Sequence, residues 1–234
     1  AISEHYLPNA LESKVPKKQF SIALSLADKL DTLSGFFGIN LKPTSSKDPF
    51  ALRRAALGII RLLIENNKEL KLNDLINYSL LLYHEQDFQF EIKSVQKELI
   101  NFLQGRLKYY MKEKNIRTDI INASFNSFSL NQITKIYNKS SALNKVINKE
   151  SGMDIIASYK RASNILESEL KDQDLDLSET ADPAIFKNEY EKNLYNKIKE
   201  LKKYFANISK HENYEETLDR LKSAKGVLFD FFDN

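Results

Sequence analysis

Apolar residues recur at every third or fourth position along most of this chain, and this spacing is the feature that most restricts its fold. The longest example runs from Ile92 to Tyr110, through Val95, Leu99, Phe102, Leu103 and Leu107. It predicts one amphipathic helix of about 25 residues that continues to Lys114 in spite of Gly105. Six glycines and five prolines in 234 residues leave few breaks, and no alternating β-branched run indicates a strand. The sequence predicts an all-α fold.

The same periodicity predicts further helices, over residues 16–36, 49–65, 73–83, 119–125 and 184–210, and after Ser129, Gly152 and Asn213. The sharpest start is Asp48-Pro49, because Asp is favoured as an N-cap and Pro at the first helical position. Asn66-Asn67 is expected to end that helix. KDQDLDLSETADP (171–183) is acidic and poor in large apolar residues, and we interpret it as a flexible insertion that ends in a second Asp-Pro start.

Charge is unevenly distributed along the chain. The whole sequence has a net charge of +3, but residues 92–161 hold thirteen Lys and Arg against five Asp and Glu, a net +8. Such a concentration attracts phosphates. A set of solvated lysine-rich helix faces explains it equally well.

Several classes of protein are disfavoured by what the sequence lacks. No cysteine is present, which excludes disulfides, thiol nucleophiles and cysteine-ligated zinc. No run approaches the roughly 18 apolar residues of a membrane span. The N-terminus, AISEHYLPNALES, has no basic-then-apolar signal pattern, so we expect a cytoplasmic protein.

No catalytic constellation is recognisable. The three histidines are scattered, and there is neither a glycine-rich phosphate loop nor a G-x-S-x-G turn. Asp28 and Asp31 share a helix face and could bind a metal ion. Pairing with Lys29 or Arg54 is the favoured interpretation, because no histidine lies close in sequence. We expect no catalytic residue and no metal site.

The best binding candidates are basic residues around the Asp48-Pro49 start. Arg53 and Arg54 follow it by one turn, Arg61 lies further along, and Lys42 and Lys47 precede it in a loop. A guanidinium can hold two phosphate oxygens at once, so this group suits an anionic ligand. The alternative, that Arg54 pairs with Asp28 or Asp31 and joins two helices, remains equally open.

The segment RLKYYMKEKNIR (106–117) combines basic and aromatic side chains. Proteins that bind RNA commonly use positive charge for phosphates and aromatic rings for unpaired bases. Arg106, Tyr109 and Arg117 are the candidates here. Tyr110 belongs to the apolar stripe and is expected in the core.

ADKLDTLSGFFGINLKPTSSKDPFALRRAALGIIRLL (27–63) resembles a signature segment of bacterial glycyl-tRNA synthetase β subunits. Other segments are similar to the same family: EHYLP (4–8), FLQGRLKYYMKEKNIRTDIINA (102–123), YKRASNIL (159–166) and VLFDFFDN (227–234). One departure is Pro43-Thr44-Ser45, where the family has Pro-Thr-Gly.

The resemblance implies a fragment of a longer subunit with three parts. Residues 1–70 would be the C-terminal part of an HD-like domain, 71–152 a helical connecting region, and 153–234 a DALR-like anticodon-binding helical bundle truncated at its C-terminus. Asp28 falls where HD domains place their last metal-ligating aspartate. The other ligands would lie before residue 1, so no metal is expected.

The resemblance also implies a function. The chain would be the tRNA-binding portion of glycine–tRNA ligase and would position tRNA(Gly). A separate α subunit, in an α2β2 enzyme, would hold the active site with ATP and Mg; no cofactor is expected here. Lys160, Arg161 and Asn164 in the YKRASNIL segment become further tRNA-binding candidates, although Asn164 could instead brace a neighbouring helix. The alternatives are a helical scaffold for the α subunit or another protein, and a remnant of an HD-type phosphohydrolase.

Overall fold

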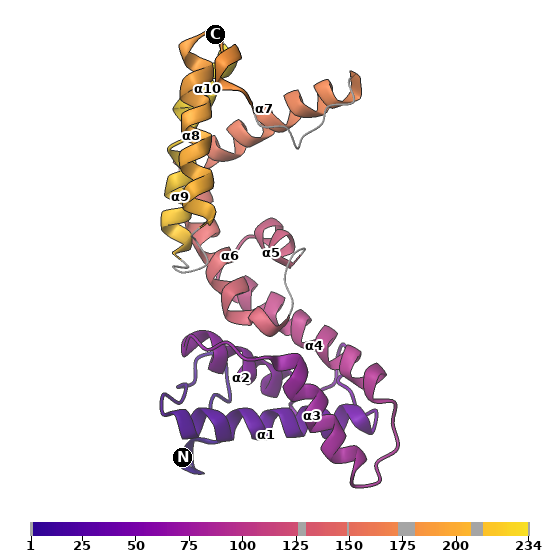
Figure 1. Cartoon of the computed structure of the whole chain (residues 1–234). Coiled ribbons are helices and arrows are strands. Elements are labelled where there is room, and N and C mark those ends of the chain that lie inside the picture. Colours follow the sequence, from indigo (N-terminus) through magenta and orange to yellow (C-terminus); the bar gives the residue numbers. More distant parts are fainter. Residues whose placement is uncertain (1, 126–129, 149, 173–180, 207–212, 234) are drawn as a thin grey trace. The chain divides into compact units, whose positions relative to one another are not determined.

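The computed structural model describes residues 2–125, 130–148, 150–172, 181–206 and 213–233, and within these ranges the chain has helices and no strands (Figure 1). This confirms the all-α prediction. The helices are α1 (Gln19–Gly38), α2 (Leu52–Glu65), α3 (Leu72–His84), α4 (Ile92–Glu113), α5 (Thr118–Phe125), α6 (Ile133–Ile147), α7 (Glu150–Asp172), α8 (Glu189–Ala206), α9 (Tyr214–Lys222) and α10 (Lys225–Asp233). Short 3-10 helices cover Ile2–Glu4, Leu130–Gln132 and Pro183–Ile185. None of the helices in these ranges is long and apolar enough to cross a membrane.

The chain forms two compact units, residues 1–140 (unit 1) and 141–234 (unit 2). In unit 1, α1, α2, α3 and α4 pack on one another around a dense core. The core includes Leu33 of α1, Ile59 of α2, Leu80 of α3 and Leu103 of α4, each no more than 1% exposed. Both predicted segments 1–70 and 71–152 therefore contribute helices to this core. The domain boundaries taken from the resemblance stay predictions.

The start of α2 differs from the prediction by three residues. Asp48 does cap the helix, since its carboxylate accepts hydrogen bonds from the backbone N–H groups of Leu52 (2.9 Å) and Arg53 (3.0 Å). Pro49 is nevertheless outside it, because the chain passes through a left-handed residue, Ala51 (φ 55°), before the helix begins. The Asp48 carboxylate therefore caps the helix from four residues before its first residue, instead of from the position next to it.

Two buried cations hold the segment that precedes α1. The Lys29 ammonium donates to the carbonyls of residues 5, 6 and 7 (3.2–3.3 Å) and to Ser25 Oγ (2.8 Å). Burial lowers the pKa of Lys29. The Arg61 guanidinium donates to the carbonyls of Ala10 and Ser13 and to Glu65 Oε1 (2.6 Å). The N-terminal segment, residues 2–16, is thus clamped on either side of Asn9.

Gly58 makes this close approach possible. A Cβ atom at this position would lie 2.5 Å from Lys29 Cε and 3.1 Å from the carbonyl oxygen of Pro8. A side chain here would displace the end of the Lys29 side chain and crowd the Pro8 carbonyl.

Unit 2 corrects three further expectations. Gly152 lies inside α7 and does not precede it; a Cβ there would be 2.0 Å from the carbonyl oxygen of Val146, so the glycine serves the turn from α6 into α7. Asp182-Pro183 starts a 3-10 turn, with Asp182 accepting from the N–H of Ala184 (2.9 Å), and α8 begins only at Glu189. The single helix expected after Asn213 is two, α9 and α10. Within 171–183, residues 173–180 lie outside the described residues.

Candidate nucleic-acid interface

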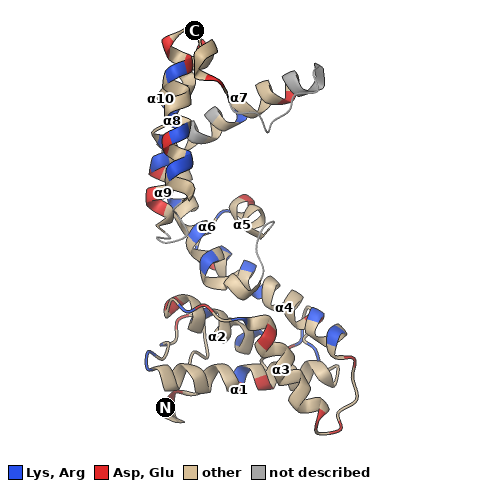
Figure 2. Ribbon diagram, viewed as in Figure 1, with Lys and Arg blue, Asp and Glu red and all other residues tan. Residues whose placement is uncertain are grey.

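A basic hollow lies on unit 1 where α2, α4 and the N-terminal segment meet. Its lining comprises Asn9, Ala10, Arg53, Arg54, Leu57, Arg106 and Tyr109, and its volume is about 530 Å³. We call it the basic groove. Four of the residues singled out in the sequence line it, two from each helix, although about fifty residues separate the pairs. Helix α4, whose Lys and Arg positions are blue on the ribbon in Figure 2, provides one wall.

The two arginines of α2 differ in their surroundings. Arg53 is half-buried and donates to the carbonyl oxygen of Thr44, which fixes it against the preceding loop. Arg54 is exposed, and no described residue forms an ion pair or side-chain hydrogen bond with it. Neither Asp28 nor Asp31, considered above as its partners, makes that pair. The Arg54 charge is therefore available to a ligand.

Arg106 and Tyr109 form the wall on α4. The guanidinium carbon of Arg106 lies 5.3 Å from the centre of the Tyr109 ring, a cation–π contact that aligns the two side chains. The Nε atom of Arg106 is buried and has no hydrogen-bond partner among the described residues. Tyr109 is 42% exposed, whereas Tyr110 is 1% exposed, so the expectation that Tyr110 is a core residue is confirmed.

The other candidates in unit 1 lie outside the basic groove. Lys42 forms an ion pair with Glu98, and Lys47 is exposed in the loop before α2. Arg117 binds Asp119 through two nitrogens (2.7 and 3.2 Å), and these hydrogen bonds lower the pKa of the Asp119 carboxyl group. Arg61 is only 4% exposed and its guanidinium is engaged by the N-terminal segment. It joins parts of the protein, the role considered above for Arg54.

In unit 2 the candidates of α7 divide in the same way. Lys160 and Asn164 are exposed and four residues apart, so they share one face of the helix. Arg161 is tied to α10: it donates to Asp233 Oδ1 (2.7 Å) and to the carbonyl of Phe232 (3.1 Å), and lies over the Phe232 ring. Lys160 and Asn164 are therefore accessible to a ligand, while Arg161 joins α7 to α10.

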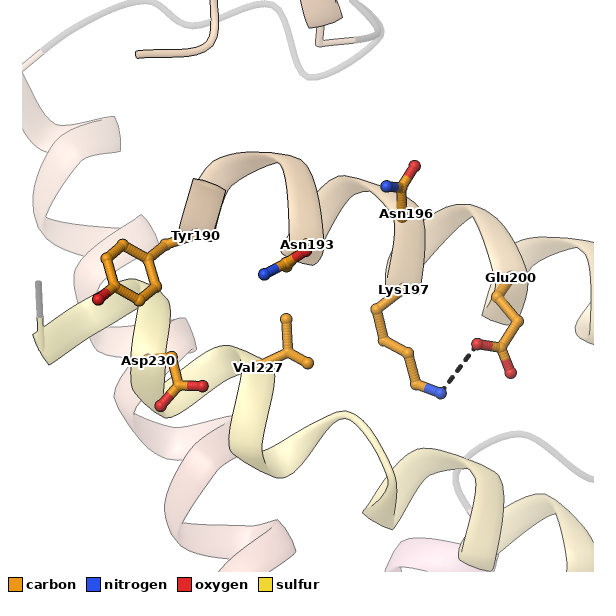
Figure 3. A pocket seen from close by; sticks show the side chains of 7 residues that line it. All are labelled: Tyr190, Asn193, Asn196, Lys197, Glu200, Val227 and Asp230. Carbon is orange, nitrogen blue, oxygen red and sulfur yellow. Dashed lines mark hydrogen bonds and ion pairs between the residues drawn. The ribbon is translucent and has the colours of Figure 1, made fainter. Parts of the chain in front are cut away.

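A second polar hollow, of about 280 Å³, lies between α8 and α10 (Figure 3). It is lined by Tyr190, Asn193, Asn196, Lys197, Glu200, Val227 and Asp230. Lys197 donates to Glu200 Oε2 (2.9 Å), and this hydrogen bond and charge lower the pKa of Glu200. With one cation, already paired, and two carboxylates, this hollow does not favour phosphate.

No group of three or more His, Asp or Glu in the part of the chain that the structure describes is placed to hold a metal ion. Asp28 and Asp31, the carboxylate pair noted in the sequence, do not line the same hollow. The carbonyl of Asp31 accepts from the Tyr83 hydroxyl (3.3 Å), and Asp28 lines a hollow next to the basic groove.

Sequence reasoning could not find Asn9, Ala10 and Leu57 as lining residues. None of them has a chemical signature of binding, and all three enter the groove through tertiary packing. A basic pair on one helix and an Arg-x-x-Tyr pair on another were visible. That these two pairs lie in one groove could not be predicted from the sequence. Periodicity indicates which face of each helix is buried, but not which helices lie next to each other.

Comparison with known proteins places these residues in a family. The family model described as glycyl-tRNA synthetase beta subunit matches residues 1–126, which include the whole basic groove. Glycine–tRNA ligase beta subunits are similar over this entire chain: 33% identity over 233 residues in Clostridioides difficile, 31% over 238 in Listeria welshimeri and 32% over 245 in Persephonella marina. The chain covers 32%, 33% and 34% of those proteins, about one third of their length. By the match over more than half of its residues, the chain belongs to the glycyl-tRNA synthetase beta subunit family.

Proposed function

We propose that this chain is a tRNA-binding part of a glycine–tRNA ligase beta subunit and that it positions tRNA(Gly) for glycylation. Positioning contributes to a reaction by holding the reacting groups in a productive geometry, without any bond-making by the chain itself. In this proposal an α subunit supplies the active site with ATP and Mg, the enzyme is a cytoplasmic α2β2 tetramer, and this chain carries no cofactor.

The observation that carries the proposal is the basic groove. Arg53, Arg54 and Arg106 line one hollow with Tyr109 at its edge. Guanidinium groups bind phosphate oxygens in pairs, and an exposed ring offers a stacking surface to an unpaired base. The groove thus offers both contacts that RNA needs.

Lys160 and Asn164 offer a second contact in unit 2. Both are exposed on one face of α7, a lysine for phosphate and an amide for a base edge. This face is the part of the chain to which we assign the anticodon contact. The α subunit is the partner that we expect to perform the chemistry.

Salt-dependent binding tests the groove. Arg54→Ala with Arg106→Ala removes two positive charges, and we expect tRNA(Gly) to bind about tenfold more weakly or worse. The slope of log affinity against log salt should fall by about two, because roughly one counterion is released per phosphate contact. Fluorescence anisotropy of labelled tRNA over a salt series measures both quantities.

The matched control is Lys192→Ala with Lys199→Ala. Both lysines are exposed on α8 and neither lines the groove, so this variant makes the same charge change without removing a groove residue. If both double variants weaken tRNA binding equally, the binding depends on overall positive charge and not on the groove. Unchanged affinity in both would favour the helical scaffold for the α subunit instead.

A further inference from the structure

A second hollow adjoins the basic groove on the far side of Arg54. Its volume is about 380 Å³, and it shares Asn9 and Arg54 with the groove. Two aromatic residues line it, Tyr6 (68% exposed) and Phe50 (41% exposed). Asp28 is its one carboxylate among the described residues. We call it the aromatic hollow; Arg54 and Asn9 line both it and the basic groove.

The polar side chains of the aromatic hollow divide into engaged and free groups. The Lys29 ammonium donates hydrogen bonds to carbonyls of the N-terminal segment, and the Thr32 hydroxyl donates to the carbonyl of Asp28 (2.8 Å). The Asp28 carboxylate has a Coulombic attraction to the neighbouring Lys29 ammonium. Neither Asp28 nor Asn9 nor Arg54 has a side-chain hydrogen bond or an ion pair with another described residue. An amide, a carboxylate and a guanidinium therefore face one aromatic-lined space without neutralising one another.

A nucleotide of RNA matches this arrangement. Its phosphate suits Arg54, which also belongs to the basic groove, and its base suits a hollow with exposed rings. The carboxylate of Asp28 selects among the bases, since an ionised carboxylate only accepts hydrogen bonds. Guanine presents two adjacent donors, N1–H and the 2-amino group, on its Watson–Crick edge. Cytosine and adenine place an acceptor beside their single amino group, and uracil flanks its one N–H with two carbonyls.

We propose that the aromatic hollow binds an unpaired guanine of the RNA. Asp28 accepts from N1–H and the 2-amino group, the base lies against Tyr6 or Phe50, and Arg54 binds the adjoining phosphate. Asn9 lies between base and phosphate. The proposal deepens the function proposed above and rests on it, because it assumes that RNA occupies the basic groove.

Short oligonucleotides test the base preference directly. We expect labelled UUGUU to bind the chain about tenfold more tightly than UUAUU, UUCUU or UUUUU in anisotropy titrations, because a good bidentate base contact gives a discrimination of that order. Replacing the guanine by inosine, which lacks only the 2-amino group, should lose most of this advantage by leaving one carboxylate oxygen unpaired. The inosine arm needs no protein variant, so it stays informative whatever a substitution does to folding.

Asp28→Asn supplies the complementary test on the protein. The variant should bind all four oligonucleotides with similar affinity, and UUUUU no more weakly than the wild type, because a negative charge has been removed. Asp31→Asn is the matched control: it makes the same change one turn along α1, on an exposed residue outside the aromatic hollow, and should keep the preference for guanine.

Three results would overturn the guanine site. They are the absence of any guanine preference in the wild type, equal binding of UUGUU and its inosine analogue, and loss of the preference in both Asp variants. The tRNA-binding proposal fails separately. If Arg54→Ala with Arg106→Ala weakens tRNA binding and the wild type has no base preference, the groove proposal is supported and the guanine site is contradicted.

Discussion

Arg54 and Arg61 lie on the same helix, seven residues apart, and their surroundings differ. Arg54 is exposed beside two hollows, while Arg61 is 4% exposed and holds the carbonyls of Ala10 and Ser13. The N-terminal segment covers Arg61 but leaves Arg54 exposed, although Asn9 of this segment lines the same hollows as Arg54. Removal of a buried guanidinium that satisfies several carbonyls is costly to stability, whereas the exposed Arg54 is the residue to which we assign ligand binding.

Arg61→Ala should lower the free energy of unfolding of unit 1 by about 2 kcal/mol, a typical figure for hydrogen bonds to a charged group. The substitution leaves two carbonyls and the Glu65 carboxylate without their donor. Urea denaturation followed by circular dichroism measures the loss. Arg54→Ala is the control and should change stability by less than about 0.5 kcal/mol; equal effects would contradict the assigned roles.

Tyr110 should make the stability of unit 1 sensitive to alkaline pH. Burial and the nearby Glu65 carboxylate raise the pKa of Tyr110 to about 12, against 10.0 for a free tyrosine. A pKa that is higher in the folded state means that the unfolded chain loses its proton first. The contribution of Tyr110 is therefore complete below pH 10 and is lost as pH rises from about 10 through about 12.

The measurement is the urea midpoint at pH values of about 9 and about 11, for the wild type and Tyr110→Phe. The wild type should lose more stability between the two pH values than the variant, which has no phenol to ionise. Parallel losses would show that the buried phenol does not resist ionisation.

The residue types at the site could be predicted from the sequence, but their separate roles could not. Arg53, Arg54, Arg106 and Tyr109 stand out by charge and aromaticity, and so does Arg61. Nothing in the local pattern indicates that residues 2–16 fold back over Arg61 or that Asn9 enters the groove. Those facts depend on contacts between residues about fifty positions apart.

At the scale of elements, the start of α2 sets the position of the groove arginines. Asp48 caps two backbone N–H groups across the left-handed Ala51, so the first turn begins at Leu52 and Arg53 and Arg54 lie in it. A helix that began after Arg54 would leave both arginines in the preceding loop.

Asp48→Ala should cost about 1 kcal/mol of stability and loosen this first turn. We expect weaker tRNA binding as a consequence, although Asp48 is not a groove residue. Hydrogen exchange of the amides of Leu52 and Arg53 measures the local effect, and it should increase while exchange in the middle of α4 stays unchanged. Equal protection in variant and wild type would mean that the carboxylate does not hold the helix start.

Periodicity was a reliable guide to the existence of helices and a weaker guide to their ends. It gives α4 almost completely, because seven apolar residues repeat over five turns. It misplaces the starts of α2, α7 and α8. Before α2 and α8 the aspartate lies several residues ahead of the first helical residue, and in α7 the glycine lies inside the helix. Capping residues in a sequence locate the end of a helix to within about one helical turn. The exact first residue depends on the backbone conformation before the helix.

At the scale of the whole molecule, the two units are packed to different densities. The helices α1 to α4 of unit 1 contribute many residues that are almost fully buried, whereas α8, α9 and α10 contain no buried residue among those described. An apolar hollow of about 450 Å³ lies among the helices of unit 2, with Leu194, Leu201 and Leu228 in its lining. Unit 2 therefore gains less from burial of apolar surface.

Unfolding should occur in two transitions, with unit 2 first. Hydrogen exchange read on peptides of α8 and α2 at increasing urea concentration separates them. Ala162→Leu adds apolar volume to the hollow in unit 2 and should raise the first transition alone, by about 1 kcal/mol. A single transition shared by both units would contradict the difference in packing.

The clamp around the N-terminal segment has a consequence for how the groove responds to its surroundings. Arg54 and Tyr109, to which we assign the ligand contacts, are exposed to solvent ions, so added salt competes with the ligand. The Lys29 and Arg61 contacts that hold Asn9 in place are shielded from those ions. Rising ionic strength should thus release what the groove binds and leave the shape of the groove intact, ready for another molecule when the salt is lowered.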